Sequence, residues 1–314
     1  MRKVLYLLDQ TEFNEDELPK LPEGFERCVL TKNASAEERL KEIADAEIVF
    51  GEPTMEELHH GKKLRWVQMF WAGADRYLKG SFPKNVALTT ASGAFGETIS
   101  EHALAMMFAL CRRLPDYSRS KDWTDRGTEK QISGAAAMIF GCGDIGSEIA
   151  KRLKALGLRT IGVCRNARSP RPYFDSLTTL SCAAAFLPEA DFILCAMPSN
   201  HDTDGFFDAH HLSLLKKDAV LINVGRGRLI DTNALTACLK DGKLFGVGLD
   251  VTEPEPLPPE HPLRAFPNVI ITPHVAGVSF GHLRETERKI FSICEENLMH
   301  YLKNEPLRNT VIVP

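Results

Sequence analysis

The sequence predicts an α/β fold made of two domains, each with a parallel sheet. Short apolar runs alternate with helical patterns along the 314-residue chain, which is typical of βα units. A glycine pattern, G-x-G-x-x-G at residues 141–146, follows one such run and opens a helical pattern. A turn of this kind normally opens its own domain, yet 140 residues precede it here. We therefore expect a separate folding unit before the glycine turn.

The first series of predicted strands lies in the N-terminal part of the chain. These strands are expected at residues 4–8, 28–30, 48–50, 66–69 and 86–89. Residues 36–46 carry apolar positions at helical spacing and are expected to form a helix between two of the strands. A long apolar helix is predicted over residues 98–110, and Pro115 is expected to end it.

A second series of strands begins near Gly134. Its members are expected at residues 135–140, 159–163, 192–196, 219–224, 245–251 and 269–272. The helix after the glycine turn is predicted over residues 147–156, and a last long helix over residues 282–303. The segment that follows, residues 304–309, is expected to pack back on the first domain.

Composition and charge argue against several classes of protein. A net charge of −4 gives no basic surface for nucleic acid. The N-terminus is charged again too soon for a signal peptide, and no apolar run reaches the roughly 18 residues of a membrane span. The 8 cysteines are scattered, mostly in apolar runs and without a C-x-x-C pair, as in reduced cytoplasmic proteins. This use of cysteine predicts a cytoplasmic protein. The two histidine pairs in the sequence lack metal-ligand spacing, so we expect no metal site.

The glycine turn itself is Gly141-Cys142-Gly143-Asp144-Ile145-Gly146. Such a turn presents backbone N–H groups at a helix N-terminus to a pyrophosphate. A structural turn or a nucleotide site of another class can show the same letters, but the strand before it and the helix after it favour a dinucleotide. The expected cofactor contacts are Gly141, Gly143, Asp144, Ile145 and Gly146.

Ligands of open α/β sheets bind beyond the carboxyl ends of the strands, so the residues that follow the second series of strands are candidates for a site. They are Met197-Pro198-Ser199, Gly225-Arg226-Gly227, Thr252-Glu253-Pro254-Glu255-Pro256 and Pro273-His274-Val275-Ala276-Gly277. Three successive strand ends thus offer an arginine, two glutamates and a histidine to one crevice.

Each of these residue types has a chemical use. The Arg226 guanidinium is a rigid fork for a carboxylate or carbonyl, and His274 can move a proton near neutral pH. A glutamate bonded to this histidine would fix its tautomer and keep it protonated. Beside a nicotinamide, the set describes the reduction of a ketone. Taken singly, each side chain is also consistent with an ordinary surface or strand-end position, so the joint placement carries the prediction.

With these motifs in order, the chain resembles the D-isomer-specific 2-hydroxyacid dehydrogenases over nearly its whole length. The segments that carry the resemblance are Trp71-Ala72-Gly73-Ala74-Asp75, residues 96–113 with Glu101-His102, Asn223-Val224-Gly225-Arg226-Gly227, Leu249-Asp250-Val251 with Glu255-Pro256-Leu257, Thr272-Pro273-His274-Val275-Ala276-Gly277, and Asn297 with Pro306-Leu307-Arg308-Asn309. The resemblance implies two Rossmann-like or flavodoxin-like domains, with a central cofactor domain inserted into a substrate domain made of both chain ends. The substrate domain would comprise residues 1–98 and 283–314, and the cofactor domain residues 99–282. A homodimer formed through the cofactor domain is also implied.

The resemblance further implies roles for individual residues. Arg226 would orient a 2-oxo acid, and His274 would be the acid and base with Glu255 as its partner. The spacing from Asp250 selects Glu255 over Glu253, and Asp250 itself would bind the nicotinamide carboxamide. Backbone amides of the substrate loop would bind the substrate carboxylate, and they belong to Trp71, Ala72 and Gly73. The remaining expected cofactor contacts are Met197, Pro198, Val224, Gly225, Arg226, His274 and Gly277.

The choice of cofactor depends on the end of the second strand of the cofactor domain. An NAD site places an acidic residue there, whereas this chain has Cys164 and then Arg165, Asn166 and Arg168, with no acidic residue before Asp175. Guanidinium groups suit a 2′-phosphate, so we expect NADP(H) to be preferred, with NAD(H) as the alternative. Arg165 is expected to contribute more than Arg168 because it directly follows the strand.

The sequence therefore predicts an enzyme that reduces a small 2-oxo acid, such as glyoxylate or hydroxypyruvate, to the D-2-hydroxy acid. The bulk of Trp71 is expected to limit the size of the substrate. Two alternatives stay open: a cofactor-sensing corepressor of the same fold, and a phosphite dehydrogenase. The intact set of Arg226, Glu255 and His274 favours the enzyme over the corepressor.

Overall fold

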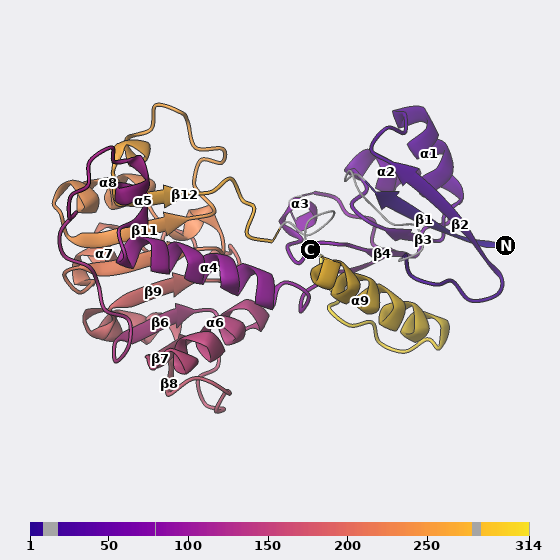
Figure 1. Cartoon of the computed structure of the whole chain (residues 1–314). Helices are drawn as coiled ribbons and strands as arrows, with labels where there is room; N and C mark the ends of the chain where they lie inside the picture. The colour runs from indigo at the N-terminus through magenta and orange to yellow at the C-terminus, as the bar shows by residue number, and fades with distance from the viewer. Residues whose placement is uncertain (9–17, 79, 278–283, 314) are drawn as a thin grey trace. The chain divides into compact units, whose positions relative to one another are not determined.

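The computed structural model describes residues 1–8, 18–78, 80–277 and 284–313 of the chain. The chain divides into two compact units, which are Met1–Phe95 with Val278–Pro314, and Gly96–Gly277. Each unit has a parallel sheet of its own (Figure 1). The predicted α/β fold with two parallel sheets is confirmed.

The first unit is built on a five-stranded parallel sheet. Its strands are β1 (Arg2–Leu8), β2 (Phe25–Thr31), β3 (Ile48–Phe50), β4 (Trp66–Gln68) and β5 (Ala87–Thr89). Their spatial order, β2-β1-β3-β4-β5, is the flavodoxin-like order. Every strand expected in this part of the chain is present.

The helices of the first unit pack on its sheet. They are α1 (Ala36–Asp45), α2 (Met55–His60), α3 (Asp75–Leu78) and α9 (Arg284–Leu302). Ile43 of α1 and Leu58 of α2 pack with Val49 on one face. Side chains alternate along a strand, so the next residues point to the other face, where Trp66 stacks on Tyr301 of α9 with ring centroids 5.4 Å apart. The expected start of the last helix, residue 282, lies outside the described residues.

The chain returns to the first sheet after α9. Thr310 pairs with Thr89 of β5 in an antiparallel bridge, and the N–H of Val311 donates to the carbonyl of Leu88 at 2.8 Å. The side chain of Asn309 donates to the carbonyl of Ser92 at 2.7 Å. The expected packing of the C-terminal segment on the first unit is therefore confirmed.

The second unit is built on a seven-stranded parallel sheet. Its strands are β6 (Ala136–Phe140), β7 (Arg159–Val163), β8 (Ser176–Thr178), β9 (Phe192–Cys195), β10 (Ala219–Asn223), β11 (Leu244–Leu249) and β12 (Val269–Ile271). The order β12-β11-β10-β9-β6-β7-β8 is the Rossmann order with one further edge strand. It reverses between β6 and β9, the place where open α/β sheets bind ligands. Strand β8 was not predicted, because only one of its residues, Leu177, is strongly apolar.

Helices connect the strands of the second unit. They are α4 (Gly96–Cys111), α5 (Leu114–Arg119), α6 (Asp144–Ala155), α7 (Ala209–Leu214) and α8 (Thr232–Lys240), with 3-10 segments at Leu180–Glu189, Gly227–Leu229 and Pro262–Ala265. The expected domain boundary at residues 98 and 99 falls inside α4. The other expected boundary, at residues 282 and 283, lies outside the described residues.

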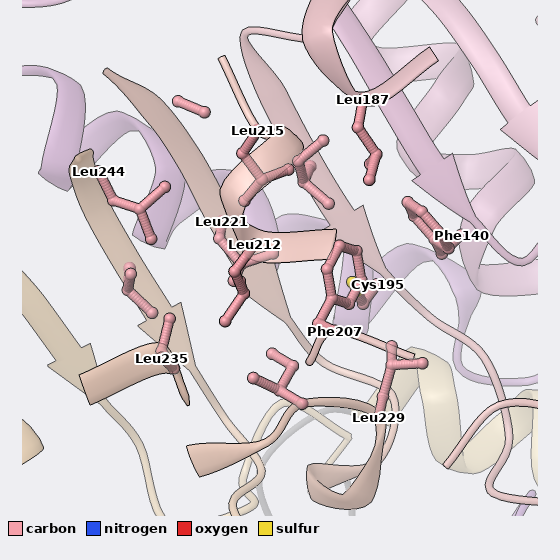
Figure 2. Close-up of a cluster of buried hydrophobic side chains, with 14 of the residues drawn as sticks. Phe140, Leu187, Cys195, Phe207, Leu212, Leu215, Leu221, Leu229, Leu235 and Leu244 are labelled. Carbon is pink, nitrogen blue, oxygen red and sulfur yellow. The ribbon is translucent and has the colours of Figure 1, made fainter. Parts of the chain in front are cut away.

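The strands of the second sheet are apolar on both faces because helices cover both. On one face, Phe140 and Leu221 point into a cluster with Leu212 of α7 and Leu235 of α8 (Figure 2). On the other face, α4 lies against β10 and β11. Gly246 in β11 makes this approach close, since a Cβ atom there would lie 2.9 Å from Cδ2 of Leu110. Helix α4 therefore runs directly over the strands that lead to the predicted site.

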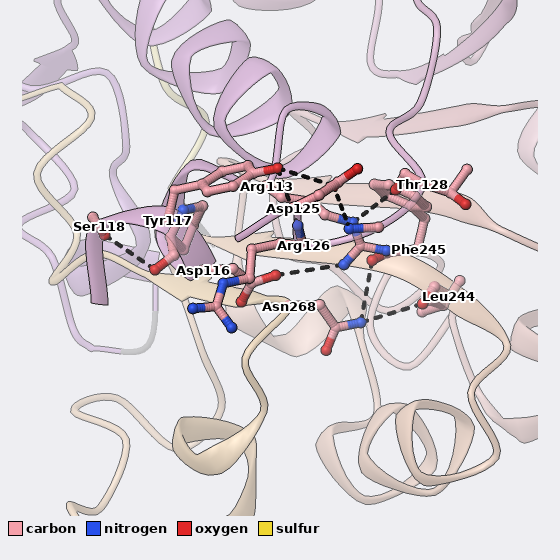
Figure 3. Close-up of polar contacts among 12 residues, drawn as sticks. Arg113, Asp116, Tyr117, Ser118, Asp125, Arg126, Thr128, Leu244, Phe245 and Asn268 are labelled. Atoms are coloured by element: carbon pink, nitrogen blue, oxygen red, sulfur yellow. Dashed lines mark hydrogen bonds and ion pairs between the residues drawn. The ribbon is translucent and has the colours of Figure 1, made fainter. Parts of the chain in front are cut away.

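The end of the long helix differs from the prediction. Helix α4 ends at Cys111, and Pro115 lies in the first turn of α5, so the prediction that Pro115 ends the long helix was wrong. Proline is well tolerated in a first helical turn, and the chain turns at Arg113 instead, where φ is 51°. Nε of Arg113 donates to the carbonyl of Thr128 at 2.7 Å, and its guanidinium lies 5.2 Å from the ring centre of Phe245 (Figure 3). The contact with Phe245 joins this corner to β11.

Candidate active site

Two of the predicted catalytic side chains meet beyond neighbouring strands. His274 follows β12, and Glu255 lies in the loop after β11. Nδ1 of His274 lies 2.5 Å from Oε1 of Glu255. The side chains are 49% and 41% exposed, so both can reach a ligand or solvent. Because the carboxylate accepts the Nδ1 proton, Nε2 of the imidazole is left for proton exchange with a ligand.

A buried carboxylate, Asp250, shapes the turn that carries His274. Its Oδ1 accepts the Thr272 hydroxyl at 2.6 Å and the Val275 N–H at 2.9 Å, and its Oδ2 accepts the Ala276 N–H at 3.0 Å. The N–H of His274 donates to the Asp250 carbonyl at 2.8 Å. These bonds hold His274 at a φ of 56°, a left-handed conformation that is uncommon for residues other than glycine.

Helix α4 adds a second histidine to this arrangement. Nε2 of His102 lies 3.0 Å from Oγ1 of Thr272 and 3.7 Å from Oδ1 of Asp250. Because the Thr272 hydroxyl donates to Asp250, its oxygen accepts from His102. The resemblance implied that Asp250 binds the nicotinamide carboxamide. In the structure the Asp250 carboxylate accepts hydrogen bonds from Thr272, Val275 and Ala276. The sequence showed His102 only as part of a motif, without a role.

The loop that carries Arg226 is fixed by Asn223, the last residue of β10. The Asn223 amide donates to the Arg226 carbonyl at 2.9 Å, and its oxygen accepts the Gly225 N–H at 3.1 Å. Gly227 packs against the loop after β11 so closely that a Cβ atom would lie 2.0 Å from the Thr252 carbonyl oxygen. The Arg226 loop and the Glu255 loop are therefore in direct contact.

A hydrogen bond and an ion pair also connect the Arg226 loop and the start of α8 to the Glu255 loop. The hydroxyl of Thr232 donates to the carbonyl of Glu253 at 2.6 Å. The side chain of Arg228 forms an ion pair with that of Glu253 at 3.3 Å. Glu253 thus serves the connection between the loops, whereas Glu255 serves the histidine, which supports the choice of Glu255 as the partner.

The glycine turn fits a dinucleotide pyrophosphate. At Gly146 a Cβ atom would lie 1.7 Å from the Gly141 carbonyl oxygen, and at Gly141, where φ is 100°, it would lie 2.7 Å from the Ala196 carbonyl oxygen. At Gly143, by contrast, a Cβ atom would meet nothing within 4 Å. Two glycines therefore close the turn and the third borders open space at the start of α6, whose first turn has no side-chain cap among the described residues.

Residues predicted to line the cofactor site lie between this turn and the Arg226 loop. A Cβ atom at Gly141 would lie 3.2 Å from Cγ of Met197, and one at Gly225 would lie 2.7 Å from the Met197 carbonyl oxygen. Met197 therefore touches both turns, and Pro198 follows it along the chain. Val224 is buried next to Gly225. The structure thus brings these predicted residues together at the point where the strand order reverses.

The end of β7 carries the predicted arginines. Arg165, Asn166 and Arg168 are exposed, and the Asn166 side chain accepts the Arg168 N–H at 3.1 Å, which forms a tight turn. A third arginine, Arg171, was missed by the sequence analysis. Its Nη1 donates to the carbonyl of Cys142, inside the glycine turn, at 2.9 Å.

The thiols next to this turn are buried. Burial raises the pKa of Cys142 to about 12, and the neighbouring Cys164 acts in the same direction. At neutral pH Cys142 is therefore a protonated, small apolar side chain. In the described parts of the chain no helix has the length and apolar character of a membrane span, and no three His, Cys, Asp or Glu side chains cluster as metal ligands would.

The predicted substrate loop follows β4 in the first unit. Trp71 stacks on Phe95 with ring centroids 6.0 Å apart and an angle of 15° between the planes. The N–H groups of Phe70 and Trp71 both donate to Oε1 of Glu52, at 2.8 and 3.2 Å. Glu52 was missed by the sequence analysis, because nothing in its immediate neighbourhood links it to this loop. Ala72 and Gly73 complete the loop before α3.

The fold and the site define a class of protein. A Rossmann strand order, a glycine turn shaped for a pyrophosphate, and a histidine–carboxylate pair beside a loop with an arginine are the parts of a dinucleotide-dependent oxidoreductase. The comparisons with known proteins narrow this class to one family.

The model of the D-isomer specific 2-hydroxyacid dehydrogenase, NAD binding domain, matches residues 104–276. A glyoxylate/hydroxypyruvate reductase from Arabidopsis thaliana is 32% identical over 234 residues, covering 73% of this chain and 70% of that protein. A glyoxylate reductase from Korarchaeum cryptofilum is 28% identical over 325 residues, covering 96% and 93%. A family member from Aeromonas salmonicida, known as a crystal structure, aligns with a TM-score of 0.86 and 30% identity over 99% of each chain. The chain belongs to the D-isomer specific 2-hydroxyacid dehydrogenase family.

Proposed function

We propose that this protein reduces a small 2-oxo acid, glyoxylate or hydroxypyruvate, to the D-2-hydroxy acid, and that NADPH is its preferred reductant. The observation that carries the proposal is the contact of 2.5 Å between Nδ1 of His274 and Oε1 of Glu255, on loops beyond adjacent strands of a dinucleotide-binding sheet. The resemblance supplies the D configuration of the product. We also propose that the unit made of both chain ends holds the substrate and that the central unit holds the cofactor.

In the reaction, the nicotinamide supplies the hydride when bound. His274 donates a proton from Nε2 to the oxygen of the substrate carbonyl, and Glu255 stabilises the imidazolium before this transfer. Arg226 holds the substrate with its guanidinium fork. In the reverse direction the neutral imidazole takes the proton back. The half-exposed histidine regains its proton from water between turnovers.

The cofactor contacts follow from the glycine turn and the end of β7. Gly141, Gly143, Asp144, Ile145 and Gly146 would face the pyrophosphate, and Arg165 and Arg168 the 2′-phosphate of NADP(H). Arg171 supports the turn through its bond to the Cys142 carbonyl. The remaining contacts would come from Asn166, Met197, Pro198, Val224, Gly225, Asp250 and Gly277. NAD(H) is the competing cofactor.

The proposal is tested by following the absorbance of NADPH and NADH with a panel of 2-oxo acids. We expect turnover with glyoxylate and hydroxypyruvate, lower kcat/KM with phenylpyruvate because of the Trp71 ring, and a preference for NADPH. Nicotinamide-dependent oxidation of phosphite without turnover of any 2-oxo acid would favour the phosphite dehydrogenase. Cofactor binding without turnover of either would favour a corepressor.

We further propose a cytoplasmic homodimer formed through the central unit. Four large apolar side chains on α4, α5 and the segment after them are exposed: Phe108 at 37%, Leu114 at 53%, Tyr117 at 38% and Trp123 at 104%. Apolar side chains gathered in one part of the chain are typical of an interface. Trp123→Glu is expected to lower the mass seen in sedimentation, whereas Leu78→Glu, at an exposed position in the other unit, should not. A monomeric wild type would contradict the dimer.

A further inference from the structure

A short connection in the first unit holds both ends of the predicted substrate loop. It joins β3 to α2. At the start of the loop, Oε1 of Glu52 accepts the N–H groups of Phe70 at 2.8 Å and Trp71 at 3.2 Å. At the other end, the hydroxyl of Tyr77 in α3 donates to the carbonyl of Pro53 at 2.7 Å. The loop is therefore spanned and fixed by two consecutive residues.

The connection is well suited to this task because its own backbone is constrained. Gly51 has a φ of 123°, and a Cβ atom there would lie 2.6 Å from the Leu7 carbonyl oxygen, so only glycine fits. Pro53 restricts the residue before it, Glu52, to an extended backbone. Thr54 caps α2 in a capping box with Glu57. The backbone that carries Glu52 is thus held in one conformation while its side chain binds the loop.

The carbonyl groups of the loop set the direction of the next two N–H groups. The Trp71 carbonyl accepts the Ala91 N–H at 3.0 Å, and the Ala72 carbonyl accepts the Ser92 hydroxyl at 3.4 Å. In a trans peptide the C=O and the following N–H point in opposite directions. The N–H groups of Ala72 and Gly73 therefore both point away from residues 91 and 92, and neither donates to an acceptor among the described residues.

We infer that Glu52 is a positioning residue for the substrate: it binds the first two N–H groups of the loop and so directs the N–H groups of Ala72 and Gly73 to the substrate carboxylate. The inference rests on the proposed function of this loop. It changes the expected role of Trp71, whose N–H is taken by Glu52 and which contributes its indole ring. A carboxylate is suited to this role because hydrogen bonds to an ionised acceptor are about twice as strong as neutral ones.

The test compares Glu52→Ala, Glu52→Gln and a control, Glu56→Gln, which removes the same charge from an exposed position in α2. For Glu52→Ala we expect the KM for glyoxylate to rise about tenfold or more, with kcat within about threefold of wild type, since only substrate holding is lost. Glu52→Gln keeps an oxygen that can accept both N–H groups, so its KM is expected to rise only about threefold. The control and the affinity of all variants for NADPH should stay unchanged.

An unchanged KM in Glu52→Ala would overturn the role, as would a loss shared equally by KM, kcat and NADPH affinity, which would indicate a general structural defect. If Glu52→Ala does not fold, Glu52→Gln is the deciding variant. An unchanged KM for glyoxylate in Glu52→Gln would overturn the positioning role of Glu52. A wild type without turnover of any 2-oxo acid would instead overturn the proposed function. The affinity for oxamate, an unreactive analogue, then tests Glu52, and an equal Kd in wild type and Glu52→Ala would refute it.

Discussion

The two parallel sheets present different chemistry beyond their strands. In the seven-stranded sheet, the loops after β10, β11 and β12 carry the side chains of Arg226, Glu255 and His274. In the five-stranded sheet, the loop after β4 offers the backbone N–H groups of Ala72 and Gly73. Proton transfer requires a titratable side chain, whereas an anion can be held by peptide dipoles alone. In the proposed enzyme, the first sheet therefore contributes backbone groups that bind the substrate carboxylate, and the second contributes the side chains for proton transfer.

The two regions nevertheless share one structural device, a carboxylate that binds two consecutive backbone N–H groups of the functional turn. Asp250 binds those of Val275 and Ala276, and Glu52 binds those of Phe70 and Trp71. Asp250 is only 2% exposed and shares its Oδ1 with the Thr272 hydroxyl, whereas Glu52 is half-buried. In both regions a carboxylate thus fixes the backbone geometry of a functional turn. This holds for the turn that presents the His274 side chain and for the loop that presents backbone N–H groups.

The largest expected effect separates chemistry from binding most directly. His274→Asn removes the proton donor and is expected to lower kcat at least about 100-fold, within the range that general acid catalysis supplies. The affinity for NADPH, measured by fluorescence titration, should not change. His201→Asn, at a fully exposed position of the same unit, is the matched control and should retain full activity. A kcat within a few-fold of wild type would contradict the role of His274.

The second effect tests whether the seven-stranded sheet also takes part in binding. Arg226→Lys replaces a planar fork by a point charge, so the KM for the 2-oxo acid is expected to rise at least about tenfold while the Kd for the cofactor stays the same. Arg228→Lys alters a neighbouring arginine that pairs with Glu253 and should have little effect. Equal losses for substrate and cofactor in Arg226→Lys would mean that the arginine supports the structure.

The third effect concerns cofactor choice within the same sheet. Arg165→Ala is expected to lower kcat/KM for NADPH about tenfold and to spare NADH, because a charge-assisted bond of roughly 1.5–3 kcal/mol to the 2′-phosphate is lost. Arg171→Ala should weaken both cofactors alike, since its bond to the glycine turn serves either one. A wild type that prefers NADH would contradict the assignment of Arg165.

The smallest effect concerns the carboxylate that contacts His274. In Glu255→Gln a neutral amide replaces the carboxylate that accepts the Nδ1 proton of His274. A hydrogen bond to a neutral acceptor is weaker than one to a carboxylate by about 1 kcal/mol, so kcat for glyoxylate is expected to fall about fivefold while the Kd for NADPH stays the same. Equal kcat values in wild type and Glu255→Gln would show that the pairing seen in the structure has no part in the reaction.

The sequence by itself determined the elements and the residues whose signals are local. Alternating apolar runs located the strands of both sheets except the short β8, and the glycine spacing located the cofactor turn. The same strands pointed to Arg226, Glu255 and His274, because the residue that follows a strand of a parallel sheet can be read directly from the chain. These are short-range patterns, and each of them can be recognised within about 15 residues.

Only the tertiary structure decided which side chains hold the site residues and their turns in place. Glu52 reaches Phe70 across 18 residues of sequence, Arg171 reaches Cys142 across 29, and His102 reaches Thr272 across 170. Such pairs leave no periodicity in the sequence, because the bonds are made to backbone groups or across elements that only packing brings together. The fold class follows from local patterns, whereas the geometry of the site depends on hydrogen bonds between distant segments, which exist only after the sheets have formed.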